Sequence, residues 1–529
     1  MVGGFHRHKH HGEADHEVLD LEQALERRMT ISRRGILFGA TAAGAALLAR
    51  SRVGRAEAGR FVNPLRIPPL LDGKPGPDGN IYDLNVASGK SEFLSGLKTP
   101  TLGINGSYLG PTIRCRENDR VILRVKNDLT EPTTLHWHGL RIPAASDGGP
   151  HQIVEPGAVW ETSFAIKQKA SLCWYHSHLM EHTGLQVLRG LAGLFLIEED
   201  QSHSLHLPSE YGVDDIPLVI QDRRFRADGS FDYALAMHDT MMGYKGNVVL
   251  VNGTANPYVI LRRQRTRLGV LNGSNSRIYT LGRDDGAELI VIGSDGGLLE
   301  RPARLSRVRL GPGERVEILV DMQANQTVRL MSYPDRVTAG GMGPGMMMGG
   351  MAGNTETFPI IELRAAQLET TDLSLPEELI LVPNWTAAQA TRTRTFTLDM
   401  PMMGMNMGGM MGGPRMEGLM GINGRSMNKR RIDERVAAGS VEIWEIKNAT
   451  PIAHPFHIHG VQFRTLDRNR EPPSPHERGL KDTVLVDAGS TVRVITEFAD
   501  FADPQHPYMY HCHILEHEDA GMMGQFVVA

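Results

Sequence analysis

The hydrophobic positions of the chain form short runs rich in Val, Ile, Leu and Thr, and Gly, Pro and Asn separate these runs throughout. Apolar residues rarely recur at the spacing of three and four residues that marks an amphipathic helix. Short runs with turn residues between them are typical of antiparallel β-sandwiches. The pattern therefore predicts an all-β protein rich in loops, in agreement with its 58 glycines and 30 prolines.

A hydrophobic residue followed by Asn-Gly occurs three times, at residues 104–106, 251–253 and 422–424. Asn-Gly alone marks only a turn, but alternating residues typical of strands follow each copy. The chain has 529 residues, and at roughly 150 residues per domain this length suggests about three domains. We expect an internal repeat of three consecutive β-sandwich domains, with bounds at 59–205, 206–370 and 371–529.

Charge excludes two classes of partner. The formal net charge is −5, 22% of the residues are charged, and the sequence contains no basic tract. Proteins that bind nucleic acid or a membrane surface by charge carry a basic patch. We expect no nucleic-acid partner, no membrane partner for the mature chain, and a monomer.

The N-terminus predicts export. Ser32, Arg33 and Arg34 precede an apolar run at 35–49, and Ala-Glu-Ala at 56–58 offers a cleavage site. This arrangement resembles a twin-arginine signal peptide spanning residues 1–58. The apolar run is too short and too rich in Gly and Ala for a convincing membrane span, although an uncleaved anchor remains an alternative. We expect the mature protein in the periplasm or otherwise outside the cytoplasm.

The stretch His511 to Met523, HCHILEHEDAGMM, carries the candidate chemistry. In a strand, alternate side chains point to opposite faces, so His511 and His513 share one face and Cys512 points to the other. Cys512, His517 and a weak axial Met522 supply most of a trigonal copper site. A buried cysteine is often only a small apolar residue, but this joint pattern favours a metal. The other two cysteines, at 115 and 173, could pair or stay free, and we favour free thiols.

Four His-X-His pairs complete the picture, and all four lie in runs that read as strands. They are His136 with His138, His176 with His178, His457 with His459, and His511 with His513. Such a pair projects both imidazoles from one face, which suits two metals of one cluster. The middle repeat has no such pair, so eight histidines would hold three coppers between the first and last domains. His454 would give Cys512 its second imidazole.

The motifs HWHG, WYHSH, HPFHIHG and HCHILEHEDAGMM resemble the four copper motifs of the multicopper oxidases, the family of laccases, ascorbate oxidase and bacterial cuprous oxidases. The resemblance covers nearly the whole chain after the signal, and it implies three cupredoxin-like Greek-key domains and four copper ions. It implies a type 1 copper on His454, Cys512, His517 and Met522, a type 2 copper on His136 and His457, and a type 3 pair on His138, His176, His178, His459, His511 and His513.

The resemblance also implies the reaction. Electrons from a reductant would pass from the type 1 site through Cys512 to His511 and His513, and dioxygen would be reduced to water at the three-copper cluster. Asp147 and Glu518 match acidic positions that the family places near this cluster, where they would deliver protons. Without that role each would be an ordinary turn or surface carboxylate.

Methionine distinguishes this chain. Of 26 methionines, five lie at 342–351 and ten at 400–427, both times mixed with glycine. Such segments are either passive loops or soft thioether ligands for additional Cu(I). Known cuprous oxidases carry an Asp and a Met just before HPFHIHG, whereas this chain has Thr-Pro-Ile-Ala at 450–453. His238, Met241 and Met242 in the middle domain could also contribute, although we favour a chance grouping there.

We therefore expect an enzyme that oxidises Cu(I) in copper tolerance and reduces O2 to water. One alternative is a laccase-like oxidase of phenols and aromatic amines. Another is a non-enzymatic copper-sequestering protein, although storage requires no such cluster. A copper-free structural relative of the cell-division machinery is disfavoured because every ligand position is filled.

Overall fold

The computed structural model describes residues 60–335, 356–400 and 420–529. The predicted signal peptide and the methionine-rich loop at 342–351 lie outside the described residues, as do residues 401–419 of the second methionine-rich segment. Within the described ranges the chain forms six β-sheets, and the few helices are short. The prediction of an all-β protein is confirmed.

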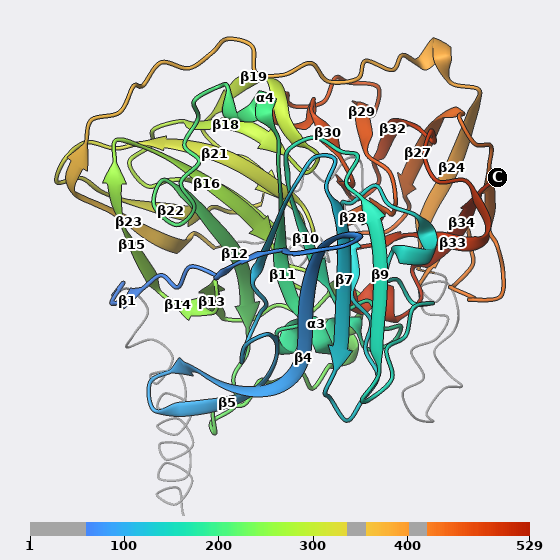
Figure 1. The fold of residues 1–529 in the computed structure, drawn as a ribbon, viewed down its shortest axis with the longest axis horizontal. Coiled ribbons are helices and arrows are strands. Elements are labelled where there is room, and N and C mark those ends of the chain that lie inside the picture. The colour runs from blue at the N-terminus through green and yellow to red at the C-terminus, as the bar shows by residue number, and fades with distance from the viewer. Residues whose placement is uncertain (1–59, 336–355, 401–419) are drawn as a thin grey trace, which may run out of the picture. The chain divides into compact units, whose positions relative to one another are not determined.

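Two sheets are built from the chain between Leu70 and Glu198, which we call the first sandwich (Figure 1). One has the strand order β3-β4-β7-β9, with β5 paired to β4, and the other the order β2-β6-β11-β10-β8. The strands are β2 (Leu70–Asp72), β3 (Lys74–Gly76), β4 (Gly79–Leu94), β5 (Leu97–Ile104), β6 (Thr112–Arg116), β7 (Arg120–Asn127), β8 (His136–His138), β9 (Val159–Ala165), β10 (Ser171–His176) and β11 (Ala192–Glu198).

The middle sandwich spans residues 215–369 and also takes in the first strand of the described chain. Its sheets have the orders β14-β13-β12-β16-β21-β18-β19 and β1-β15-β23-β22-β17-β20. The strands are β1 (Asn63–Pro64), β12 (Asp215–Arg223), β13 (Val248–Val251), β14 (Thr254–Ala255), β15 (Pro257–Arg263), β16 (Arg265–Asn272), β17 (Tyr279–Arg283), β18 (Leu289–Ser294), β19 (Gly297–Leu305), β20 (Val308–Leu310), β21 (Arg315–Asp321), β22 (Thr327–Ser332) and β23 (Phe358–Glu369).

The last sandwich spans residues 392–528. Its sheets have the orders β25-β24-β27-β32-β29-β30 and β26-β34-β33-β28-β31. The strands are β24 (Arg392–Asp399), β25 (Gly421–Ile422), β26 (Glu434–Val436), β27 (Val441–Asn448), β28 (His454–Ile458), β29 (Phe463–Arg468), β30 (Leu480–Lys481), β31 (Thr483–Val486), β32 (Thr491–Glu497), β33 (Asp503–Cys512) and β34 (Met523–Val528).

Each sandwich has its own apolar core between its two sheets. Burial of the alternating Val, Ile and Leu positions of facing strands is the main force that holds such sheets together. In the last sandwich the core includes Trp444, Phe456 and Phe526, together with Cys512 and Met522. The candidate Cys-containing site therefore lies inside the core of one sandwich.

The three Asn-Gly signatures play the same structural role. Asn105, Asn252 and Asn423 have φ angles of 53°, 50° and 55°, a left-handed conformation that Asn tolerates better than most residues. Each side chain accepts a hydrogen bond from one strand residue and donates to the carbonyl two residues earlier. The partners are Asn85 and Asp83, Val219 and Pro217, and Thr397 and Thr395. This shared geometry is the structural signature of an internal repeat.

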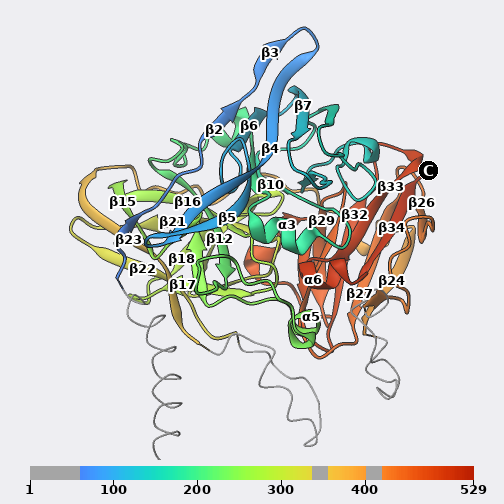
Figure 2. The same cartoon turned by 90° about the horizontal axis from the view of Figure 1, so that it is seen from below.

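The described helices are α3 (Thr183–Arg189), α4 (Asp200–His203), α5 (Met237–Met242) and α6 (Leu515–Asp519), with 3-10 turns at η1 (Ala144–Ser146), η2 (Ala387–Gln389) and η5 (Pro475–Glu477). Helix α6 follows the HCH motif. It contacts α3 of the first sandwich and α5, which lies between β12 and β13 of the middle sandwich (Figure 2). None of the helices in the described ranges combines the length and apolar character that a membrane span requires.

Candidate metal centres

The four His-X-His pairs begin on strands that are neighbours within each terminal sandwich. Only the His136–His138 pair lies wholly within a strand, because β10, β28 and β33 end before their second histidines, His178, His459 and His513. His136 of β8 pairs in register with His176 of β10, and His457 of β28 pairs in register with His511 of β33. Residues directly opposite each other on antiparallel strands project to the same face of the sheet. Each terminal sandwich therefore presents its own set of imidazoles on one face.

The two sets meet ring against ring. His138 stacks on His457 with ring centroids 3.6 Å apart and an angle of 9° between the planes. His136 stacks on His459 with centroids 3.8 Å apart at 19°. Since the first and last sandwiches each supply one ring of both stacks, the site exists only at their interface, as the distribution of histidines along the sequence predicts.

Within this cluster the imidazole nitrogens fall into groups of three, in which the nitrogens lie within 4.8 Å of one another. The groups are His178, His459 and His511; His136, His138 and His176; and His136, His457 and His459. The remaining histidine, His513, has its ring 5.0 Å from the ring of His138 and 5.3 Å from that of His176. All eight histidines are buried.

The donor set fits metal ions. Burial lowers the pKa of six of these imidazoles well below the usual value, so that they remain neutral and keep a lone pair. These are His138, His176, His178, His457, His459 and His513. Several ring nitrogens of the cluster are buried without a hydrogen-bond partner, among them Nε2 of His136, His176 and His457. Unpaired buried nitrogens are costly in an empty site, and cations that bind imidazole would satisfy them.

A second group of donors lies in the last sandwich. The Cys512 Sγ atom is 3.2 Å from Nδ1 of His454 and 3.7 Å from Nδ1 of His517. Burial raises the pKa of the Cys512 thiol and lowers the pKa of His517 to about 3. A Cys512 thiolate would place a negative charge in this buried site between two neutral imidazoles. A bound cation would compensate that charge, so this group also fits a metal.

Met522 is fully buried in the same apolar cluster as Cys512. Its backbone donates a hydrogen bond to the His517 carbonyl, and its carbonyl accepts one from the Cys512 amide, at 2.8 and 3.0 Å. The turn that places His517 beside Cys512 thus also brings Met522 back to the same site.

The outward nitrogens of this site have partners of their own. Nε2 of His454 lies 2.6 Å from the Thr450 hydroxyl, and Nε2 of His517 lies 3.3 Å from the Met241 carbonyl on α5. The Ile514 amide donates to Cys512 Sγ at 3.4 Å. Because these partners hold the outer Nε2 atoms, Nδ1 of both histidines faces the sulfur.

The two predicted acidic residues lie against the histidine cluster. Asp147, which follows η1, places Oδ2 2.7 Å from Nδ1 of His459, and its carbonyl accepts a hydrogen bond from Nδ1 of His136 at 2.9 Å. Glu518 of α6 places its two carboxylate oxygens 3.1 Å from Nδ1 of His178 and 3.2 Å from Nδ1 of His511. Burial alone would raise the pKa of Glu518, but these two imidazoles outweigh it and lower the pKa to about 2.

Sequence reasoning missed one further carboxylate. Asp482 Oδ1 lies 3.0 Å from Nε2 of His138, and the Asp482 carbonyl accepts from Nδ1 of His457 at 2.8 Å. Both carboxylate oxygens also accept from Arg315 of the middle sandwich, at 2.7 and 2.6 Å. The only sequence signal is the charged pair Lys481-Asp482 inside an otherwise apolar run.

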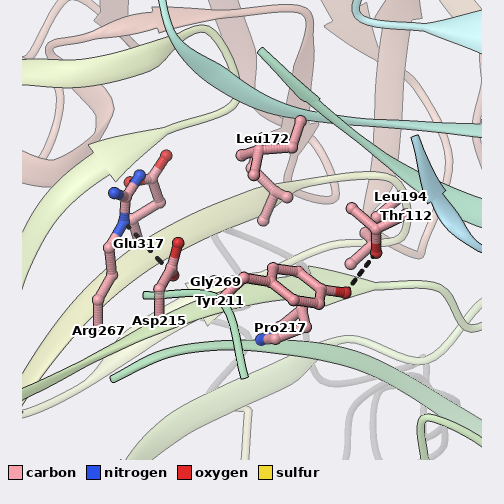
Figure 3. Close-up of a pocket in the computed structure, with 10 residues that line it drawn as sticks. Thr112, Leu172, Leu194, Tyr211, Asp215, Pro217, Arg267, Gly269 and Glu317 are labelled. Atoms are coloured by element: carbon pink, nitrogen blue, oxygen red, sulfur yellow. Dashed lines mark hydrogen bonds and ion pairs between the residues drawn. The ribbon is translucent and has the colours of Figure 1, made fainter. Parts of the chain in front are cut away.

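A small cavity lies between the first and middle sandwiches, away from the predicted ligands (Figure 3). Its volume of about 20 Å³ suffices for a single water molecule. Tyr211 donates or accepts a hydrogen bond with Thr112 at 2.7 Å on one side, and Arg267 pairs with Glu317 on the other. None of the residues that line the cavity belongs to the histidine groups, so we regard it as part of the domain interface.

Cys115 and Cys173 are both buried free thiols, as expected. Burial raises the pKa of Cys173 to about 11, which keeps this thiol protonated and unreactive.

Comparisons with known proteins agree with this arrangement. Family models described as multicopper oxidase match residues 85–202 and 395–529. A multicopper oxidase of Staphylococcus aureus is 33% identical over 88% of this chain and 92% of its own length. The cell division protein FtsP of Dickeya dadantii is 35% identical over 94% and 99%.

Solved structures give the same result. A laccase-like multicopper oxidase CueO from Ochrobactrum sp., with oxidase activity towards lignin model compounds and lignosulfonate, is 34% identical with a TM-score of 0.76, covering 88% of this chain and 100% of that one. A multicopper oxidase from Campylobacter jejuni described as a metallo-oxidase is 30% identical with a TM-score of 0.75, covering 89% and 96%.

Proposed function

The chain belongs to the multicopper oxidase family, and from this premise we propose that its reductant is Cu(I) and that it serves copper tolerance. As an oxidoreductase of this family, it uses dioxygen and a reducing substrate. The fold agrees, since the chain is all-β with cupredoxin-like sandwich domains. We propose bounds for these domains at 59–205, 206–370 and 371–529.

We propose four copper ions. The type 1 ion would be held by His454, Cys512, His517 and Met522, and the type 2 ion by His136 and His457. The type 3 pair would be held by His138, His176, His178, His459, His511 and His513. Copper at these centres supplies one-electron transfer from the reductant and reduction of dioxygen to water. The close approach of Cys512 to the first set and of its neighbours His511 and His513 to the second supports this division.

The acidic residues orient the imidazoles and stabilise nearby protons. Asp147 accepts from Nδ1 of His459 and so turns Nε2 of that ring toward His511, 3.1 Å away. Glu518 fixes His178 and His511 in the same way. Its lowered pKa keeps the Glu518 carboxylate ionised, so it stabilises a proton on a neighbouring group or water rather than holding one itself.

The observation that carries the choice of Cu(I) is the set of methionines beside the type 1 residues. Met400 and Met420, which flank residues 401–419, are buried in the apolar cluster that contains Cys512 and Met522. Met241 and Met242 of α5 pack against the same cluster. Residues 401–419 are therefore flanked on both sides by methionines of the core that also contains Cys512 and Met522, and thioethers bind Cu(I) in preference to Cu(II).

Thr450 does not replace the carboxylate that known cuprous oxidases carry in this region. Its hydroxyl is committed to Nε2 of His454 and also contacts the amide oxygen of Asn448 at 2.8 Å. The side chains that bind the substrate Cu(I) must then be methionine thioethers. Met237 and His238 of α5 are exposed and lie on the helix whose Met241 carbonyl contacts His517, which supports a contribution from this helix.

The test is oxygen uptake by the copper-loaded enzyme with a buffered Cu(I) complex and, separately, with a dimethoxyphenol. One variant replaces every methionine within residues 401–419 by leucine, which keeps side-chain volume and removes sulfur, and leaves Met400 and Met420 in the core. We expect Cu(I) oxidation to fall while phenol oxidation persists or rises. Equal loss or equal retention of both activities would reject Cu(I) as the substrate of this segment.

A laccase-like oxidation of phenols is the second candidate, and the Ochrobactrum relative favours it. The same experiment separates the two, because a phenol oxidase would turn over the dimethoxyphenol faster than Cu(I) in the unmodified enzyme. The third expectation, a copper store without catalysis, does not fit membership of an oxidase family.

We further propose that the protein is exported through the twin-arginine pathway and acts as a monomer in the periplasm. The support is the Ser-Arg-Arg sequence at 32–34, before the apolar run. Replacing Arg33 and Arg34 by lysine should keep the protein in the cytoplasm, as cell fractionation would show. A periplasmic lysine variant would reject the signal.

A further inference from the structure

A group of four methionines lies on the opposite side of β33 from the type 1 residues. Met427, Met509 and Met523 are 9%, 1% and 1% exposed and pack together, and the half-buried Met180 packs against them. The cores of the three sandwiches mix aliphatic and aromatic side chains. This one consists of thioethers alone, contributed by four separate segments of the chain.

The strand register places this group beside the histidine cluster. In the β33–β34 ladder, Met509 lies opposite Gln525 and His511 lies opposite Met523. Alternate residues share a face, so Met509, His511 and Met523 project together, whereas Tyr510 and Cys512 project into the core of the sandwich. The methionines therefore continue the row that carries His511.

Met180 approaches from the first sandwich. It follows His178 by two residues, and Nε2 of His178 lies 3.3 Å from Nε2 of His511. Two members of the group, Met180 and Met509, are thus each two residues from a histidine of this close pair. The arrangement needs both terminal sandwiches, like the histidine cluster itself.

The group also has an outer edge. Met180 is half-buried, and the next two residues, Glu181 and His182, are exposed. Met427 is held by a hydrogen bond from its amide to the Gly521 carbonyl at 3.0 Å. A small ion could therefore reach the thioethers at Met180 while Met509 and Met523 form a buried floor.

We propose that Met180, Met427, Met509 and Met523 form a binding site for one soft monovalent cation, which is Cu(I) in the cell. Thioethers are neutral and polarisable, so they suit Cu(I) and bind hard cations poorly. Neutral thioethers do not compensate the charge of a buried ion, which favours a monovalent over a divalent ion. The site is separate from the proposed type 1 residues. Its proposal does not depend on which reductant the enzyme oxidises.

The experiment uses the full-length copper-loaded enzyme and Ag(I), which has the ligand preference of Cu(I) and is not oxidised. Equilibrium dialysis against a competing thioether measures the number of Ag(I) ions bound per chain. We expect the double variant Met180→Leu, Met509→Leu to bind one ion fewer than the wild type. Met322→Leu, which alters a methionine buried in the middle core, should bind the same number.

Leucine has nearly the volume of methionine, so these variants should keep the fold. Met180→Leu alone changes only the half-buried edge and should weaken the binding of that one Ag(I) at least about tenfold. Copper content and Cu(I) oxidation should stay at the wild-type level, which separates this site from the proposed reductant site. An unchanged Ag(I) count in both variants would overturn the proposal and leave the methionines as packing alone.

Discussion

Oδ2 of Asp147 and Nδ1 of His459 lie 2.7 Å apart, although 312 residues separate them in the chain. Asp147 belongs to the first sandwich and His459 to the last, so this contact orients a ring across the domain interface. Outer partners of this kind fix which nitrogen of a histidine faces a metal.

Asp147→Asn should therefore lower turnover about 10- to 100-fold, the usual range for such outer partners. The asparagine oxygen can still accept from His459, but the negative charge is gone. Oxygen uptake gives the rate and elemental analysis gives the copper content, which should stay near that of the wild type. Full activity would show that the carboxylate charge has no part in the reaction.

Glu518→Gln should slow oxygen reduction without slowing reduction of the type 1 site. The substitution places a neutral amide between Nδ1 of His178 and Nδ1 of His511, where the ionised carboxylate now lies. Anaerobic stopped-flow bleaching of the blue band measures the first step, and oxygen uptake measures the whole reaction. Glu516→Gln is the matched control, because Glu516 on the same helix bonds Tyr233 and Asn275 instead.

Met522→Leu should raise the reduction potential of the type 1 site, because loss of a weak axial thioether destabilises Cu(II) more than Cu(I). Redox titration of the blue absorption measures the change. Cys512→Ser should abolish that absorption and turnover together. A blue Cys512→Ser protein, or an unchanged potential after Met522→Leu, would contradict the ligand assignment.

Arg315→Leu should destabilise the fold by about 3–5 kcal/mol, since it leaves the carboxylate of Asp482 buried without its partner. The midpoint of urea unfolding of the copper-loaded protein measures the loss. Lys74→Ala, which breaks an exposed pair with Asp83, is the control and should leave the midpoint in place. Equal midpoints for both variants would show that the buried pair contributes nothing.

Stability should also fall between pH 6.5 and pH 4 in a way that depends on His476. Burial lowers its pKa from the model-peptide value of 6.5 to about 4, so over this range the unfolded chain binds a proton that the folded chain does not. His476→Gln should therefore lose less stability than the wild type over the same range. Urea unfolding at several pH values measures the free energy of unfolding of both proteins. The contribution of bound copper cancels in the difference between them. Parallel curves for the two proteins would contradict this.

The strands and the faces of the histidine pairs could be predicted because both depend on local alternation. One residue separates the members of each His-X-His pair, and a period of two places both on one face while the strand continues, as it does for His136 and His138. The three Asn-Gly turns were likewise visible, since their geometry depends on one residue type at one position.

The rest of the site depends on contacts between distant segments. Asp482 belongs to none of the histidine motifs, and its partner Arg315 comes from the middle sandwich, 167 residues away. Met509 and Met523 look like ordinary core residues until the register of β33 and β34 places them beside His511. Register and domain docking are set by side-chain packing, which a single sequence does not reveal.

The position of the HCH turn in the last sandwich determines which parts of the chain a complete copper site requires. His511, Cys512, His513, His517 and Met522 all follow the first two sandwiches in the chain. A chain that ends after the first two sandwiches holds half of the histidine cluster and none of the proposed type 1 ligands. Any chain truncated before β33 lacks Cys512 and would remain colourless however well its earlier domains fold.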